Sequence, residues 1–141
     1  ITVQLTRAVA KIQLNITDEI PEGVSFFNYI YKGASVSFDP ATQIGVVSST
    51  RRNVEIEKAE GVKTFELYTF VSSDNQTVDW DFAGYSELNE VIGSKKFSDI
   101  PVLLRKVTKI DSPVFDGVIE GPTDITFTFD DTWDGVVDYT F

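Results

Sequence analysis

Alternation of apolar and polar residues is the main pattern along this chain, and it predicts β-strands. Within Lys11–Thr17 the apolar residues Ile12, Leu14 and Ile16 alternate with polar neighbours. Because successive side chains of a strand point to opposite faces, this pattern indicates a strand with one buried face. Val62–Val71 shows the same period. Further strands are expected at Val24–Tyr31, Ala34–Phe38, Val54–Glu57, Val78–Phe82, Val102–Ile110, Ile125–Phe129 and Val136–Phe141.

The spacing of these strands predicts the fold class. Turn signals rich in Pro, Gly and Asp, such as Asp18–Gly23 and Asp39–Gly45, separate short apolar segments along the chain. Roughly nine or ten short strands with regular turns are typical of an antiparallel sandwich. We therefore expect an all-β antiparallel sandwich of about seven to ten strands with at most one short helix. The 141 residues are expected to form a single domain, residues 1–141, which a longer precursor could contain.

One segment, Tyr85–Ile92, has a pattern that favours a helix. Ser86 could cap its N-terminus, and Leu88, Val91 and Ile92 would lie on one side. A helix this short depends on tertiary packing for its stability.

The opening stretch LTRAVAKIQLNI changes its phase. Val3 and Leu5 occupy odd positions, whereas the apolar residues of Ala8–Ile16 recur at even positions. A β-bulge within Arg7–Val9 would re-aim the side chains of one continuous core strand, and this is the favoured interpretation. The alternative is that the segment before Arg7 is loosely held and exposes an edge for strand addition.

Composition and charge exclude several classes of partner. The net charge is −10, so a nucleic acid is not expected as a partner, because phosphate binding needs a basic face. Anionic lipid surfaces are not expected for the same reason. No apolar run approaches the roughly 18 residues that a membrane-spanning helix needs. Any contact with a membrane would come through a lipid anchor upstream of Ile1.

The chain has neither cysteine nor histidine. It therefore lacks a thiolate nucleophile, the commonest general base near neutral pH and the commonest metal ligand. We expect no cofactor and no enzymatic activity. The acidic loop around Trp133 is a weak candidate for Ca²⁺, although its spacing differs from the EF-hand pattern and a hairpin turn is favoured. Its carboxylates belong to Asp130, Asp131 and Asp134.

Asp79 and Asp81 flank Trp80 and would point the same way from a strand, at a separation of roughly 7 Å. A hydrolase would need both carboxylates in one cleft, and solvent-facing residues are the favoured interpretation. A carbohydrate-binding module is a rival hypothesis of another class. Its stacking aromatic residues would be Trp80, Tyr85 and Trp133. Two basic segments, Ser94–Lys96 and Arg51–Arg52, are interpreted as a solvated loop and a solvated turn, with an acidic partner as the runner-up for the arginine pair.

The opening stretch resembles the segment that begins the globular part of fimbrillin-family proteins, the pilin and anchor proteins of Bacteroidales type V fimbriae. The Phe65–Phe70 strand also looks like a mid-domain strand of that family. The matching pattern is a hydrophobic residue, Leu, Arg, Ala-Lys and a further hydrophobic residue. Its positions here are Val3, Leu5, Arg7, Ala10, Lys11 and Ile12.

The resemblance implies a transthyretin-like β-sandwich that is exported as a lipoprotein precursor and acts at the cell surface or outer membrane. It implies a role in cell adhesion or fimbria assembly, with other fimbrial subunits or surface proteins as partners through strand addition. A glycan is a further candidate ligand. The residues that would carry strand pairing are Val3, Leu5, Ile12, Leu14, Val136, Val137, Tyr139 and Phe141.

Overall fold

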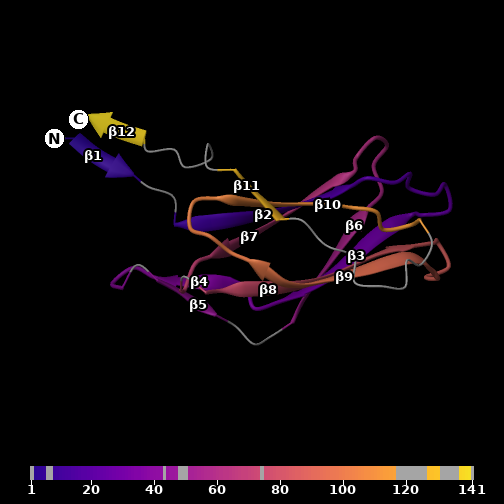
Figure 1. Cartoon of the computed structure of the whole chain (residues 1–141), viewed down its shortest axis with the longest axis horizontal. Coiled ribbons are helices and arrows are strands. Elements are labelled where there is room, and N and C mark those ends of the chain that lie inside the picture. Colours follow the sequence, from indigo (N-terminus) through magenta and orange to yellow (C-terminus); the bar gives the residue numbers. More distant parts are fainter. Residues whose placement is uncertain are drawn as a thin grey trace.

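The chain folds into a β-sandwich, as a computed structural model shows (Figure 1). The structure describes residues 2–5, 8–42, 44–47, 51–73, 75–116, 127–130 and 137–140. Two sheets of six and four strands form the two layers, and a separate pair of strands forms a third, two-stranded sheet. The described residues include no helix. The all-β sandwich predicted from the sequence is therefore confirmed, whereas its relation to transthyretin stays a prediction.

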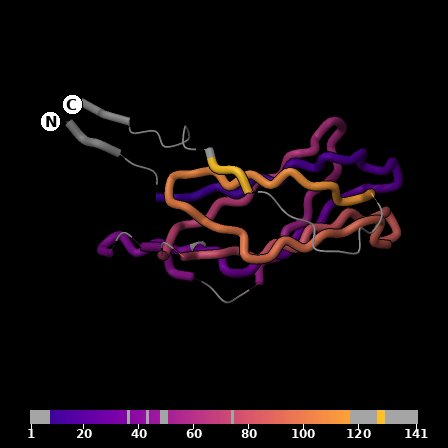
Figure 2. Tube along the Cα trace, viewed as in Figure 1, coloured from indigo at the N-terminus to yellow at the C-terminus, as the bar shows by residue number. Residues whose placement is uncertain are grey.

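The six-stranded sheet places the N-terminal part of the chain beside its C-terminal part. Strand β2 lies between β7 and β10, and its pairing with β10 is parallel, with Lys11 opposite Val107. Figure 2 shows the indigo and orange segments side by side. The other pairs in this sheet are antiparallel. Its order is β11 (Phe127–Asp130), β10 (Val107–Ser112), β2 (Val9–Ile16), β7 (Thr64–Phe70), β4 (Ser35–Asp39) and β5 (Ile44–Val47).

The four-stranded sheet is antiparallel throughout. Its two central strands, β3 and β8, carry the largest aromatic side chains of the core. The order is β6 (Arg52–Glu57), β3 (Phe26–Lys32), β8 (Thr77–Tyr85) and β9 (Val91–Pro101).

The third sheet pairs the two ends of the chain. β1 (Thr2–Leu5) runs antiparallel to β12 (Val137–Thr140), with Val3 opposite Tyr139 and Leu5 opposite Val137. The opening stretch is therefore two strands in two different sheets, rather than one bulged strand. Residues 6 and 7 between them lie outside the described residues.

Alternation places the core between the two large sheets. Ile12 and Leu14 of β2 are fully buried, as are Trp80 and Phe82 of β8. The Phe65 ring on β7 lies 4.7 Å from the Phe82 ring across the sandwich, measured between centroids. Burial of such aromatic side chains contributes the largest share of the hydrophobic stabilisation.

The helix predicted at Tyr85–Ile92 is wrong. Tyr85 ends β8, Val91 begins β9, and the backbone N–H of Ser86 donates to the Glu90 carbonyl at 2.9 Å to close a hairpin loop. The Ser86 hydroxyl accepts from the backbone N–H groups of Leu88 and Glu90, as a turn does. Apolar residues at helical spacing misled the prediction, because the Leu88 side chain is 79% exposed and has no core contact to make.

Two other boundaries differ from the sequence prediction. The strand expected at Val102–Ile110 is interrupted by a turn, because β9 ends at Pro101 and Arg105 adopts a left-handed φ of 61°. The segment Ser94–Lys96, interpreted as a loop, lies inside β9. It is polar because β9 is an edge strand whose outer face meets water.

Hydrogen bonds to the Asp18 carboxylate hold the segment that follows β10. This buried carboxylate accepts hydrogen bonds from three consecutive backbone N–H groups, those of Val114 at 3.1 Å, Phe115 at 2.5 Å and Asp116 at 2.6 Å. Burial raises the pKa of Asp18, but the backbone hydrogen bonds from Val114, Asp116 and Phe115 outweigh it and bring the pKa below its ordinary value.

The segment held by Asp18 packs the Phe115 ring against the four-stranded sheet. Gly84 and Gly93 are cross-strand partners on β8 and β9. A Cβ built on Gly84 would lie 2.7 Å from the Phe115 ring, and one on Gly93 would lie 2.5 Å from it. The two glycines therefore provide the space in which the Phe115 ring sits.

Candidate functional site

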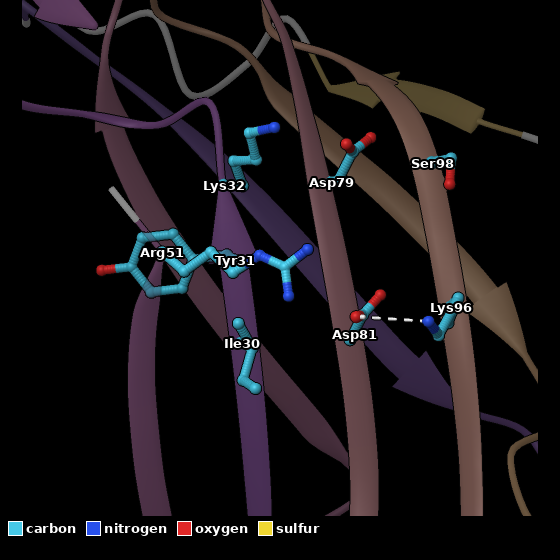
Figure 3. A pocket seen from close by; sticks show the side chains of 8 residues that line it. All are labelled: Ile30, Tyr31, Lys32, Arg51, Asp79, Asp81, Lys96 and Ser98. Atoms are coloured by element: carbon cyan, nitrogen blue, oxygen red, sulfur yellow. Dashed lines mark ion pairs between the residues drawn. The ribbon is translucent and has the colours of Figure 1, made fainter. Parts of the chain in front are cut away.

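A hollow of about 210 Å³ lies on the outer face of the four-stranded sheet (Figure 3). Strands β3, β8 and β9 and the residue just before β6 contribute to its lining. It is the candidate functional site because it gathers charged side chains from segments that are distant in the sequence. The hollow is lined by Ile30, Tyr31, Lys32, Arg51, Asp79, Asp81, Lys96 and Ser98.

Strand register explains why these side chains share one face. Asp81 lies opposite Ile30 on β3 and opposite Lys96 on β9, and Asp79 lies opposite Lys32. Cross-strand partners project to the same side of a sheet. Buried Val78, Trp80 and Phe82 alternate with the two aspartates along β8, so burial of the apolar residues directs the aspartates to solvent.

The two carboxylates lie between cations. Figure 3 shows Lys32 and Arg51 on one side of Asp79 and Asp81, and Lys96 on the other side of Asp81. The Lys96 Nζ lies 3.8 Å from the Asp81 Oδ2, which is an ion pair but is too long for a hydrogen bond.

A backbone irregularity in β9 positions the carboxylate of Asp79. The β8–β9 register shifts between Val78 and Trp80, and Asp99 adopts a left-handed φ of 54°. The Asp99 backbone N–H donates to the Asp79 Oδ1 at 3.0 Å. This bond holds one oxygen of Asp79.

The hydrolase hypothesis required Asp79 and Asp81 in one cleft, and both do line the hollow. They come from one strand and one face of it. In glycosidases the two carboxylates flank the scissile bond from its opposite sides. The hollow is also open, because the Asp81 side chain keeps 41% of its exposure. This arrangement suits binding of a polar ligand better than bond cleavage.

The aromatic residues proposed as a sugar-stacking surface are not brought together. Trp80 is fully buried and packs edge-on against Tyr29, with ring centroids 5.4 Å apart. A sugar ring stacks on an exposed aromatic face, so the prediction for Trp80 is wrong. Tyr85 is half-buried and stacks on Phe26 at 5.3 Å, and Trp133 lies outside the described residues.

The structure gives different outcomes for the residues that were predicted to carry strand pairing. Ile12 and Leu14 are fully buried in β2, which has a hydrogen-bonded neighbour on both sides, so they cannot belong to a free edge. Val3 and Leu5 lie on β1 and oppose residues of β12 within the same chain. The remaining predicted residues are on β12 or next to it. Val137 and Tyr139 belong to β12, whereas Val136 and Phe141 lie outside the described residues.

Within the described part of the chain, an apolar edge strand is present at a place that the sequence prediction missed. Its Gly45 backbone N–H donates to the Val71 carbonyl at 3.0 Å. β5 is the last strand of the six-stranded sheet, and the side chains of Ile44 and Val46 are 46% and 55% exposed. Val47 is exposed as well. The segment was interpreted as the end of a turn, although the β-branched run that follows Gln43 was a signal for the second strand of a hairpin.

Most of the acidic loop proposed for Ca²⁺ lies outside the described residues. The described residues contain no group of three His, Cys, Asp or Glu that could hold a metal ion. Of the Ca²⁺ candidates, Asp130 is the last residue of β11, and Asp131 and Asp134 lie outside the described residues.

In the described part of the chain, no helix has the length and apolar character to cross a membrane.

Comparisons with family models, with curated proteins and with solved structures find no match to this chain. Support for a function therefore comes from the fold, the hollow on the four-stranded sheet and the edge strand β5.

Proposed function

We propose that this chain is a non-enzymatic, fimbrillin-like subunit or anchor of a cell-surface fimbria that assembles by β-strand addition. The sandwich fold and the resemblance of its opening stretch support this proposal. The observation that carries it is the exposed apolar edge of β5. The rival, a carbohydrate-binding module built on stacking aromatics, loses its central residue because Trp80 is buried.

The edges of the two sheets differ in character. Edge strand β6 exposes Arg52, Glu55 and Glu57, and edge strand β9 exposes Lys96 and Asp99. Charged side chains are a common protection against unwanted strand pairing. β5 has no charged residue. An edge strand without charged side chains is suited to accept a strand from another subunit through the backbone groups that stay unpaired, and in β5 these exclude the Gly45 N–H, which donates to the Val71 carbonyl at 3.0 Å.

The experiment introduces a charge on this edge. Val46→Lys is expected to weaken self-association about tenfold, because strand addition would have to bury or displace the new ammonium group. Light scattering of the purified chain over a wide range of concentration, before and after limited trypsin digestion, measures the association. The free energy of unfolding should stay within about 0.5 kcal/mol of the wild type, because Val46 is exposed.

Asn53→Lys is the matched control, since it adds the same charge to an exposed position of edge strand β6. It should leave association unchanged. A wild-type chain that stays monomeric at every concentration, both before and after digestion, would contradict the proposal. Equal weakening by both variants would show that net charge, rather than the β5 edge, controls association.

A further inference from the structure

The hollow on the four-stranded sheet reverses the charge of the molecule locally. The chain has 22 acidic and 12 basic side chains, yet three of these cations and only two carboxylates line the hollow. Lys32, Arg51 and Lys96 therefore leave one positive charge in excess there. A local excess of one sign attracts a ligand group of the opposite sign. The hollow thus favours a ligand with a single anionic group.

The lining residues also have unused bonding capacity. Among the described residues, neither Lys32 nor Arg51 has an ion-pair partner. Asp79 uses its Oδ1 to accept from the Asp99 backbone and keeps its Oδ2 for another donor. The Asp81 carboxylate lies 3.8 Å from the Lys96 ammonium, a distance that leaves its acceptor sites open. The hollow therefore offers donors at one side and acceptors at its centre.

These requirements select among small polar ligands. Phosphate would meet the cations, but it brings little donor capacity for Asp79 and Asp81, which repel it. An amine would meet the carboxylates, but Lys32, Arg51 and Lys96 would repel it. Uncharged hydroxyl groups donate to carboxylates without this conflict. A ligand with several hydroxyls and one carboxylate satisfies both halves of the hollow.

We propose that the hollow binds a carboxylated sugar, with Lys32 and Arg51 on its carboxylate and Asp79 and Asp81 accepting from its hydroxyls. The volume of about 210 Å³ is below the 300–1,000 Å³ of a typical pocket for a drug-sized ligand, so it fits one sugar unit. An Arg guanidinium is suited to a carboxylate because its paired N–H groups can donate to both oxygens.

The surface beside the hollow leaves room for the rest of a glycan. Along the same face of the sheet, Ala83 on β8 lies opposite Asn28 on β3 and Ser94 on β9. These side chains are short and polar or small, so the path along β8 is open as far as the stacked rings of Phe26 and Tyr85, the next cross-strand pair of the same parity. The site shares no residue with the β5 edge, so it goes beyond the proposed function and can fail independently of it.

The experiment is an NMR titration of the whole chain with three probes: D-glucuronate, D-glucose and inorganic phosphate. D-glucuronate and D-glucose differ in the carboxylate alone. We expect D-glucuronate to shift the backbone amide signals around Asp81 and Lys96 and to bind at least about tenfold more tightly than D-glucose or phosphate. Arg51→Gln should weaken D-glucuronate binding about tenfold, which corresponds to one charge-assisted contact of about 1.4 kcal/mol.

Arg52→Gln is the matched control. It removes the same charge from the next residue, which is exposed on β6 and does not line the hollow. It should change the affinity less than twofold, roughly the effect of a surface charge. Equal losses from the two variants, binding of phosphate as tight as that of D-glucuronate, or no signal change at saturating D-glucuronate would each overturn the proposal.

Discussion

Replacing Asp18 with alanine is expected to lower the free energy of unfolding by about 3 kcal/mol. The carboxylate accepts from the backbone N–H groups of Val114, Phe115 and Asp116, and the alanine variant leaves all three without this partner. Hydrogen bonds to a charged group each contribute about 1.5–3 kcal/mol, and water can replace part of this at the more exposed Asp116. Chemical denaturation of the two proteins measures the difference.

The effect should depend on pH in a defined direction. Because the pKa of Asp18 is lowered in the folded protein, the unfolded state binds the proton more readily. The contribution of Asp18 to the free energy of unfolding is therefore fully present above the unfolded pKa of about 3.9. It is lost as the pH falls through the pKa of Asp18 in the folded protein. The difference between the wild type and Asp18→Ala should be constant near neutral pH and should shrink in acid.

Asp116→Ala is the control, since it removes a carboxylate from the same segment at an exposed position. It should change the free energy of unfolding by no more than about 0.5 kcal/mol. If the two variants lose the same stability, or if the Asp18 difference does not diminish in acid, the three-donor contact does not stabilise the fold as described.

Replacing Gly84 with valine is expected to cost about 2–3 kcal/mol. A Cβ at this position would lie 2.7 and 2.8 Å from two atoms of the Phe115 ring and 3.3 Å from the Val24 side chain. Overpacking of this kind forces side chains from their rotamers or shifts the backbone. Ala83→Val is the neighbouring control, because Ala83 faces the other side of β8.

A double-mutant cycle separates the ring contact from other causes. In a Phe115→Ala background the space for the valine is free, so Gly84→Val should cost at least about 1 kcal/mol less than in the wild type. Thermal or chemical unfolding of the four proteins gives the coupling. A cost that is the same in both backgrounds would mean that the Phe115 ring does not need the glycine.

The sequence predicted the fold where alternation was strong. Phe65 and Leu67 on β7, and Ile12 and Leu14 on β2, follow a period of two and are all buried. The period identifies a buried face but says nothing about neighbours in the sheet. The parallel pairing of β2 with β10 was therefore not predicted, and neither was the division of the opening stretch between two sheets.

The errors have local physical causes. Leu88 and Val91 have helical spacing yet are exposed in and beside a hairpin turn, where burial does not constrain residue type. Arg105 occupies a left-handed turn without the glycine that would have marked it. The hollow gathers Lys32, Arg51 and Lys96 from three separate segments, and only strand register brings these together. Sequence spacing did place Asp79 and Asp81 on one face.

The position of β2 between β7 and β10 has a consequence for how the chain acquires its structure. Asn15 of β2 hydrogen-bonds Asp111 of β10 across a sequence separation of 96 residues. Closing so long a loop costs conformational entropy before the contact is gained, and sandwiches rich in such contacts fold in milliseconds to seconds. During synthesis, β2 emerges long before β10, so its edge waits unpaired. A chaperone that shields this edge in the nascent chain would therefore raise the yield of folded protein.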